Sequence, residues 1–450
     1  MDTGTRMVAS LLVGLIILVI LITKTKVHVF LAMILCSIFI GLTGGMTIDE
    51  VMEAVTTGFG NSLSSIGIII GFGVMLGKLL ELSGATNVMA NTFIKLFGKN
   101  HEAEAIALSG FVTSLSIFCT SGFIILAPLV KALSRKSKKS VVTLGIALAG
   151  GLVASHSLVP PAAGPIGVAG ILNVNIGQFM LYGTILSVPI LVVSLIYGKW
   201  LGKKIYQVPD GLGGWTRERM EQTETLEVEA QTKNSLSPFL CFAPVLCAIV
   251  LILLKTILES FKINNPVINL LGQPIFALAV GLLIAIYGLT SKFSKKETLD
   301  AMEEGLKASG KLMLLVGAGG ALGRMIQDSG LGDYIAGNIV KTSISPLLLP
   351  FLIALLLRVA QGSGSVAMMT AASVTAPMVT ALQLNPVFAA LAACIGAIPF
   401  SHFNDSYFWV INETLGIRNT KEQIRVWSVT TTLSGFAALA VLLILNAVLG

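Results

Sequence analysis

The stretch from Leu312 to Ala336, LMLLVGAGGALGRMIQDSGLGDYIA, recurs in part near the start of the chain, and this recurrence constrains the fold more than any other feature. Gly71 and Gly77 correspond to Gly317 and Gly323, 246 positions later (317 − 71 = 246). Two more pairs of blocks follow in the same order and in nearly the same register: Ala127-Pro128 with Ala376-Pro377, and Ser155-His156 with Ser401-His402. Matching blocks in one order predict an internal duplication.

The composition places both copies in a membrane. Hydrophobic residues make up 54% of the 450 residues and charged residues 12%, and the mean hydropathy is +0.87. A soluble chain of this length needs more polar surface, so we expect membrane lipid around it. The net charge of +7 comes from Lys and Arg in short loops, where they orient spans, and we expect no nucleic-acid partner. The five cysteines show no CxxC spacing, so we expect no metal or cofactor.

The first apolar runs, Met7 to Ile22 and Val27 to Leu42, predict two spans that are joined by a loop with two lysines. Because positive charge is enriched in cytoplasmic loops, this loop is expected inside and the amino terminus outside. The acidic stretch 49–53 is expected to be a loop before a third span, Leu63 to Leu80.

Each copy then contains apolar runs that are too long for one straight span. Ala103 to Leu133 is interrupted by TSLSIFCTSG, and Pro346 to Leu382 is interrupted by QGSGS. Because unpaired polar groups are costly in lipid, these two runs predict re-entrant hairpins with buried tips. Val141 to Leu172 is interrupted by SHSLVPPAAGP, and Pro386 to Ile417 by SHFNDS. These two runs predict broken transmembrane helices.

The expected division is a first membrane repeat at residues 1–204, a polar cytoplasmic linker at 205–237 and a second membrane repeat at 238–450. An odd number of predicted crossings separates the two glycine-rich copies, which inverts the second copy relative to the first. The predicted fold class is therefore an all-α polytopic membrane protein with two inverted-topology repeats, each with a re-entrant hairpin and a broken transmembrane helix. Secondary transporters have this architecture, with a site near the membrane midplane.

The tip of the second predicted hairpin is rich in groups that bind anions. Gln361, Ser363 and Ser365 supply polar side chains, and Gly362 lets a ligand approach backbone N–H groups. Half-helix amino termini favour negative charge, so these residues are candidates for binding an anionic substrate. The alternative is that the small residues only permit tight helix packing.

The first predicted hairpin offers Ser114, Ser116, Thr120 and Ser121, which are substrate-binding candidates on the same grounds. His156 in the first broken helix has no adjacent acid, and it is either a substrate contact or a scaffold contact.

The run SHFNDSYFW, residues 401–409, is the most informative polar cluster. Ionisable side chains inside an apolar run are costly and are functional by default. Asp405 and His402 are the candidates for proton coupling, because a carboxylate can bind and release a proton and His titrates near neutral pH. Asn404 is a substrate-binding candidate. The alternative is a hydrogen-bonded knot that closes the helix break.

Arg358 lies just before the tip of the second hairpin. It either neutralises a substrate carboxylate or extends to the membrane interface, and the second interpretation is slightly favoured. Lys78, Glu81, Arg324 and Asp328 are expected to form ion pairs at helix ends. No Walker motif is present in the sequence, so coupling is expected to come from an ion gradient.

Four motifs carry a family resemblance: RVAQGSGSVAMMTAA, SHFNDSYFWV, GAGGALGRMIQDSGLGDYIA and HSLVPPAAGPIGVAGIL. With them the sequence resembles the gluconate permease family of bacterial proton symporters over nearly its whole length. The resemblance implies an ion transporter superfamily fold with scaffold and transport domains, a homodimer in the bacterial inner membrane, and transport of sugar acids. The positions that match family motifs are Gln361, Ser363, His402, Asn404, Asp405 and His156.

The chain departs from the gluconate carrier pattern at two places. The pattern has an acidic residue where Thr120 stands, and a His-Pro pair where Ala162 and Ala163 stand. A smaller hydroxy acid such as glycerate or hydroxybutyrate, or D-serine, is therefore also compatible with the resemblance.

Together these features predict a proton-coupled symporter of a small hydroxylated carboxylate, not an enzyme. A sodium-coupled carrier is the alternative, because unwound backbone carbonyls with Ser and Thr oxygens also hold Na⁺. A passive channel fits less well, since paired helix breaks indicate a closed site with alternating access. No nucleophile or second catalytic acid accompanies Asp405 and His402, which argues against an intramembrane hydrolase.

Overall fold

The computed structural model describes residues 3–98, 100–210, 214–218, 236–263, 265–329 and 345–449. Within these ranges the chain is mainly helical, with one short two-stranded hairpin. In the same ranges five helices are long and apolar enough to cross a membrane, or six if the two bent parts of α3 (Ile48–Ser83) count as one span. The prediction of a helical, polytopic membrane protein is confirmed at this level.

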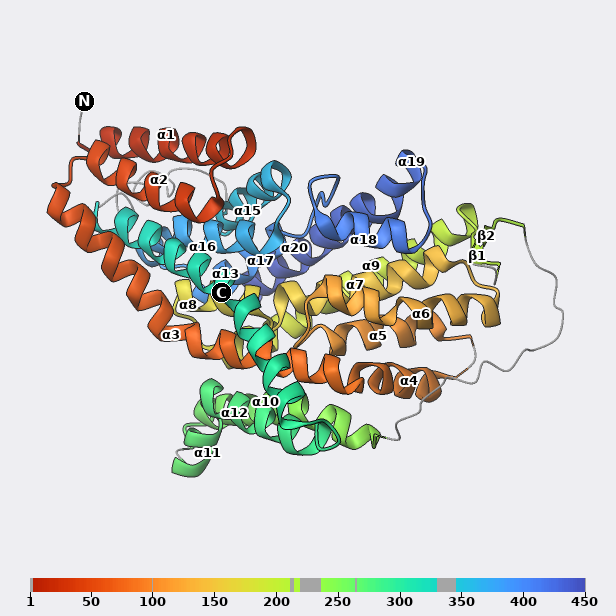
Figure 1. Cartoon of the computed structure of the whole chain (residues 1–450). Coiled ribbons are helices and arrows are strands. Elements are labelled where there is room, and N and C mark those ends of the chain that lie inside the picture. The colour runs from red at the N-terminus through yellow and green to blue at the C-terminus, as the bar shows by residue number, and fades with distance from the viewer. Residues whose placement is uncertain are drawn as a thin grey trace.

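The first half folds in the order that the sequence predicts (Figure 1). Its helices are α1 (Thr3–Lys24), α2 (Val29–Gly44), α3, α4 (Ala85–Phe97), α5 (Glu102–Thr113), α6 (Cys119–Ser137), α7 (Val141–Leu158), α8 (Ala163–Ile171) and α9 (Ile176–Lys204). The first predicted hairpin is the pair α5 and α6, with a break at 114–118. The first predicted broken helix is the pair α7 and α8, with a break at 159–162.

The second half repeats the order of long helix, hairpin and broken helix. Its helices are α10 (Pro238–Ser260), α11 (Pro266–Leu271), α12 (Pro274–Ile284) with the π-helical turn η1 (Ala285–Leu289), α13 (Lys295–Asp328), α15 (Leu348–Gln361), α16 (Gly364–Ala381), α17 (Pro386–Gly396), α18 (Ser406–Thr414), α19 (Thr420–Gln423), the π-helical turn η2 (Ile424–Ser428) and α20 (Val429–Leu449). The second predicted hairpin is the pair α15 and α16, and the second broken helix is the pair α17 and α18, with a break at 397–405.

Each half thus contains a long helix, a hairpin and a broken helix in the same order. The long helices are α3, with 36 residues, and α13, with 34. They pack against one another, and a Cβ added to Gly58 would overlap the carbonyl oxygen of Gly320. Pro128 lies inside α6 and Pro377 inside α16, as the repeat pairs them. These correspondences support the duplication, and the inverted orientation of the copies stays a prediction.

The predicted acidic loop at 49–53 is wrong, because these residues form the first turns of α3. Thr47 and Glu50 make a capping box, in which the Glu50 carboxylate accepts from the Thr47 N–H at 2.8 Å. Ser294 and Glu297 start α13 in the same way, well before the apolar stretch. Hydropathy detected only the apolar parts of both helices, whereas the capping boxes set their first residues.

The predicted linker at 205–237 lies within the described ranges only in part. There it forms an antiparallel pair: β1 (Val208–Pro209) and β2 (Trp215–Thr216). A Cβ added to Gly416 would overlap the indole of Trp215. Arg217 donates to both carboxylate oxygens of Glu422, at 2.9 and 2.7 Å. The described part of the linker therefore covers the turn between α18 and α19.

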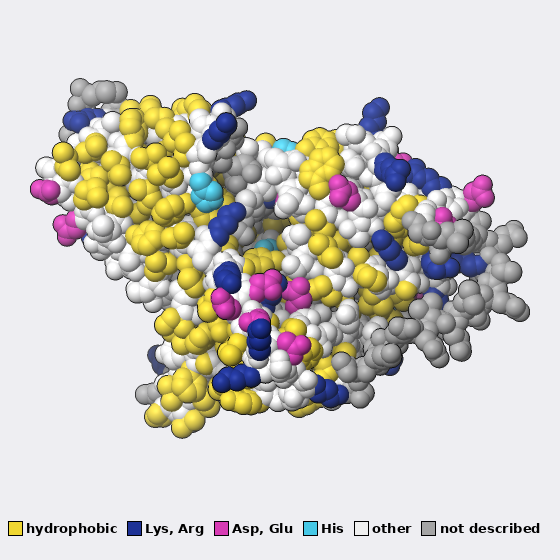
Figure 2. Space-filling model, viewed as in Figure 1, with side chains coloured by type: hydrophobic (Ala, Val, Ile, Leu, Met, Phe, Trp, Pro, Cys, Tyr) yellow, Lys and Arg dark blue, Asp and Glu magenta, His cyan; other side chains and the backbone are white. Residues whose placement is uncertain are grey.

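The outer surface carries large apolar areas. Figure 2 shows hydrophobic side chains spread over α1 and α2 and over α11 and α12. Leu12 is 55% exposed and Ile16 is 59% exposed. Soluble proteins rarely expose apolar patches of this extent, which fits a surface that contacts lipid. The same view shows a hollow between the α2 side and the α18 side of the molecule.

Close contact between α5 and α7 depends on Gly151. A Cβ at this position would overlap the carbonyl oxygen of Ala107 and lie 3.0 Å from the backbone nitrogen of Phe111. Neither atom can move without moving α5, because both belong to its backbone.

Replacing Gly151 by Ala is therefore expected to lower the free energy of unfolding by about 1–3 kcal/mol, the usual cost of overpacking. The matched control is Gly60→Ala in α3, where no atom lies within 4 Å of the added Cβ. Thermal unfolding in detergent measures both variants. Equal midpoints for the two variants would contradict the packing of α5 on α7.

Candidate functional site

A cavity of about 280 Å³ lies where several interrupted segments meet. These are the tip between α15 and α16, the break between α17 and α18, and the ends of α6 and α7 that face them. Helix breaks leave hydrogen-bonding groups inside an otherwise apolar protein, so polar groups concentrate at this point.

Most of the predicted substrate-binding side chains line this cavity. Thr120 comes from the first turn of α6 and His156 from the last turn of α7. The predicted residues that line it are Thr120, His156, Gly362, Ser363, Ser365, Asn404 and Asp405. They come from both halves of the chain, so neither half forms the cavity alone.

The serines of the first hairpin lie elsewhere. Ser114 and Ser116 line a separate void of about 10 Å³ that shares His156 with the cavity. The Ser114 hydroxyl donates to the carbonyl oxygen of Ile117 at 2.9 Å, and the Ser116 hydroxyl is buried without a partner among the described residues. Ser121 is half-buried on α6 and does not line the cavity. The void is large enough for about one water molecule, so these serines do not reach a substrate in this conformation.

His402 also lies outside the cavity lining. Its Nε2 atom lies 3.2 Å from the carbonyl oxygen of Val359, and the side chain of Asn404 donates to the same oxygen at 2.9 Å. Both side chains therefore hold the α17–α18 break against α15. Gln361 ends α15, and its side chain lies outside the described part of the chain.

Arg358 and Asp405 form a buried ion pair in the cavity wall. The distance from Arg358 Nη2 to Asp405 Oδ2 is 2.5 Å, and the two side chains are 8% and 10% exposed. Arg358 Nη1 also donates to the carbonyl oxygen of Gly362. The interpretation that Arg358 extends to the membrane interface is wrong, because its guanidinium is paired inside the protein.

Asp405 closes the break between α17 and α18. Its carboxylate accepts from the Ser401 hydroxyl and, at 3.0 Å, from the backbone N–H of Tyr407, which caps α18. Together with Arg358, these donors match an ionised carboxylate. The sequence left open the alternative that the polar run 401–409 is a hydrogen-bonded cluster that closes the helix break. The hydrogen bonds of Asp405 agree with this alternative.

Glycine is required at the hairpin tip. Gly362 has a φ of +81°, and a Cβ there would overlap the backbone carbonyl oxygen of Asn404. Because Gly362 has no side chain, the tip between α15 and α16 can contact the break between α17 and α18. Ser363 follows as the N-cap of α16 and accepts from the Val366 N–H at 3.4 Å. The amino terminus of α16, which favours negative charge, lies at the cavity.

Sequence reasoning missed part of the cavity wall. Tyr407 belongs to the polar run 401–409, and its place beside Asp405 was a usable signal. Trp427 and Thr431 come from the last apolar span, where nothing in the sequence separates them from lipid-facing residues. The polar residues that were missed are Cys119, Ser157, Ser406, Tyr407, Trp427 and Thr431.

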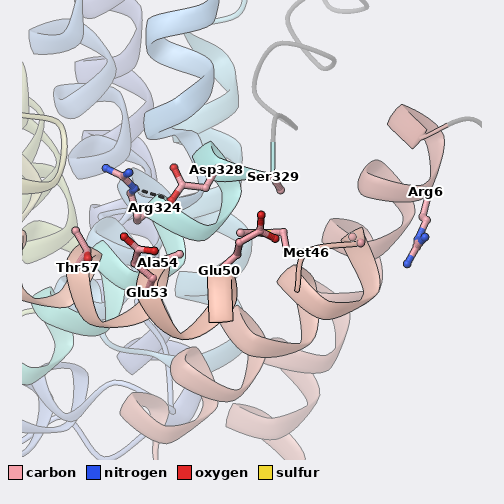
Figure 3. A pocket seen from close by; sticks show the side chains of 11 residues that line it. Arg6, Met46, Glu50, Glu53, Ala54, Thr57, Arg324, Asp328 and Ser329 are labelled. Atoms are coloured by element: carbon pink, nitrogen blue, oxygen red, sulfur yellow. Dashed lines mark hydrogen bonds and ion pairs between the residues drawn. The ribbon is translucent and has the colours of Figure 1, made fainter. Parts of the chain in front are cut away.

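A larger cavity of about 550 Å³ lies at the carboxyl end of α13, near α1 and the start of α3 (Figure 3). Arg324 there pairs with Asp328 at 2.7 Å, and these side chains are 42% and 30% exposed. The Glu50 carboxylate already caps α3. Solvent-exposed charges that are already paired bind a further ion weakly, so the smaller cavity, whose wall contains the buried Arg358–Asp405 pair, is the better candidate.

The predicted ion pairs at helix ends are confirmed. Arg324 pairs with Asp328, and Lys78 lies 3.2 Å from Glu81. Lys78 also donates to Glu304 of α13 at 2.8 Å, a contact between the two halves that the sequence did not indicate.

Comparison with known proteins places the chain in a family. The sequence profile described as GntP family permease matches residues 6–448. The chain belongs to this family. A permease of Haemophilus influenzae, described as uncharacterized, is 42% identical over 97% of this chain and 91% of its own length. The gluconate permease of Pseudomonas aeruginosa is 33% identical over 100% of this chain and 99% of its own.

Among solved structures, the YdaH transporter of Alcanivorax borkumensis, described as having an unusual topology, has a TM-score of 0.65. It is 14% identical, and the match covers 100% of this chain and 99% of that one, which is a likeness of fold alone.

Membership in the GntP permease family confirms the resemblance to gluconate permeases. It makes the chain a transporter rather than an enzyme, and a multi-pass protein of the bacterial inner membrane. For a GntP permease, a polar cavity between interrupted helices is the expected kind of place for a transported solute.

The buried pair gives a direct prediction about stability. Arg358→Gln leaves the Asp405 charge buried without a cation, and the expected loss in the free energy of unfolding is about 3–5 kcal/mol. Arg324→Gln breaks an exposed pair, with an expected loss below about 1 kcal/mol. The double variant Arg358→Gln with Asp405→Asn should recover part of the larger loss. Thermal unfolding in detergent measures all three, and equal losses for the two single variants would refute the assignment.

Proposed function

We propose that this GntP family permease is a secondary transporter that moves a small hydroxylated carboxylate into the cell together with a proton. Relatives named as gluconate permease, high-affinity gluconate transporter and L-idonate transporter support this substrate class, because gluconate and idonate are both hydroxylated carboxylates. The observation that carries the proposal is a buried, paired cation in the wall of a polar cavity that both halves of the chain form.

The substrate carboxylate is assigned to the amino terminus of α16. Ser363 and Ser365 carry hydroxyls there, and the first turn of α16, whose amino terminus favours negative charge, lies at the same cavity. Thr120, His156 and Asn404 line the same cavity and offer hydrogen bonds to the rest of the substrate. The volume of about 280 Å³ suits a small organic acid.

We assign proton coupling to a change of the carboxylate that pairs with Arg358. A substrate carboxylate that reaches this guanidinium competes with Asp405 for it. If Asp405 loses its cation while buried, taking up a proton removes an unpaired charge from an apolar place. Substrate and proton then bind together and leave together. We assign the proton to Asp405 rather than His402, because the His402 ring is hydrogen-bonded to Val359 outside the cavity.

Uptake into proteoliposomes tests the function. With an inward proton gradient and no sodium, labelled gluconate, glycerate or 3-hydroxybutyrate is expected to accumulate above its external concentration. A proton uncoupler should abolish the accumulation. If none of these acids accumulates until sodium is added, the protein is a sodium-coupled carrier and the proton assignment fails.

Asp405→Asn should abolish accumulation driven by the proton gradient but spare exchange of labelled for unlabelled acid, because the amide cannot take up a proton. Asp328→Asn is the matched control, since Asp328 lies at the other cavity with its side chain 30% exposed. Accumulation that is unchanged in Asp405→Asn would remove Asp405 from coupling.

A further inference from the structure

Besides Arg358 Nε, two hydrogen-bond donors of residues that line the cavity have no partner among the residues that the structure describes. They are the hydroxyl of Tyr407, a residue that is 4% exposed, and the indole N–H of Trp427, which is 1% exposed. Both residues line the cavity. Buried polar groups nearly always have a partner in native proteins, so two unpaired groups in one cavity wall point to a bound molecule.

Aromatic contacts fix the positions of these two groups. The rings of Tyr407 and Trp427 pack edge to face with centroids 5.3 Å apart, and Phe123 of α6 packs against Tyr407 at 6.0 Å. Trp427 lies in η2, and π-helical turns occur frequently at functional sites. Rings that are held by neighbours present their polar atoms at defined positions.

Thr431 and Asp405, which line the cavity with them, already have partners. Thr431 accepts from the Ser401 N–H at 3.3 Å and donates to the carbonyl oxygen of Trp427 at 3.2 Å. The Asp405 carboxylate is bound by Arg358 and Ser401. Arg358 Nε is also unpaired among the described residues, but it belongs to the guanidinium that is assigned to the carboxylate.

We propose that Tyr407 and Trp427 form a subsite that recognises a hydroxyl group of the substrate, an inference that rests on the proposed function and deepens it. An indole N–H only donates, whereas a phenol donates and accepts. A substrate hydroxyl accepts from Trp427 and shares a second hydrogen bond with Tyr407. A methylene satisfies neither group, and an ammonium has no lone pair to offer the indole. The subsite therefore selects a hydroxylated acid over its deoxy analogue.

Matched acids test this subsite in proteoliposomes that contain the full chain. The probes are 3-hydroxybutyrate with butyrate, glycerate with propionate, and gluconate with 2-deoxygluconate. The wild type is expected to prefer the hydroxylated member of at least one pair. Tyr407→Phe should raise the KM for that member about tenfold and leave the KM for its deoxy partner unchanged, since only one hydrogen bond is lost. Trp427→Phe should act in the same direction.

Tyr182→Phe is the matched control, because Tyr182 packs on Phe388 at 5.1 Å and does not line the cavity. It should change neither KM. Thermal unfolding of the ligand-free protein in detergent gives a second readout. Removing an unpaired buried hydroxyl should leave the unfolding midpoint of Tyr407→Phe unchanged or raise it, whereas removing a structural hydrogen bond would lower it.

The outcomes separate the two proposals. If the wild type takes up none of the probes, the proposed function fails. If the wild type prefers a hydroxylated acid and Tyr407→Phe keeps the full preference, the subsite is overturned while the proposed function stands. A lower unfolding midpoint for Tyr407→Phe would likewise overturn the subsite, because it would assign the hydroxyl to the fold.

Discussion

The arrangement at the centre of the protein depends on the buried ion pair between Arg358 and Asp405. A charge in apolar surroundings is tolerated only when it is paired and hydrogen-bonded, and each partner here also holds a helix end. Arg358 binds the carbonyl oxygen of Gly362 at the hairpin tip, while Asp405 accepts from Ser401 and from the backbone of Tyr407. One pair therefore closes two interruptions at the same place, and the cavity lies where they meet.

The ion pair between Arg358 and Asp405 also affects how the cavity can bind an anion. Because Arg358 is already neutralised by Asp405, an anion that binds at this guanidinium has to displace Asp405 or bring a cation with it. The first half of the chain contributes Thr120 from α6 and His156 from α7 to the cavity wall. The aromatic side of the cavity adds Tyr407, whose polar atom finds no partner within the described part of the protein. The proposed function and the proposed subsite thus place charge compensation and hydroxyl recognition on different groups of the same cavity.

Much of the fold could be predicted from the sequence, because apolar runs of excessive length, interrupted by Pro, Gly and Ser, have few structural solutions in a membrane. The breaks at 114–118 and 397–405 lie where the polar interruptions are. The start of α3 was missed because hydropathy does not detect the capping box at Thr47, which consists of polar residues. In the site, Asp405 could be predicted from its cost in an apolar run. The partner of Arg358 and the contribution of Trp427 could not, because both depend on tertiary contacts that bring distant segments together.

We propose that the transported acid binds between Arg358 and Tyr407. A cryo-electron microscopy map of the full chain, recorded with a saturating concentration of an acid that it transports, tests this most directly. The account predicts density for the acid in the cavity at the amino terminus of α16, with its carboxylate beside Arg358. Density in the cavity near Arg324, with the Arg358–Asp405 cavity empty, would contradict it.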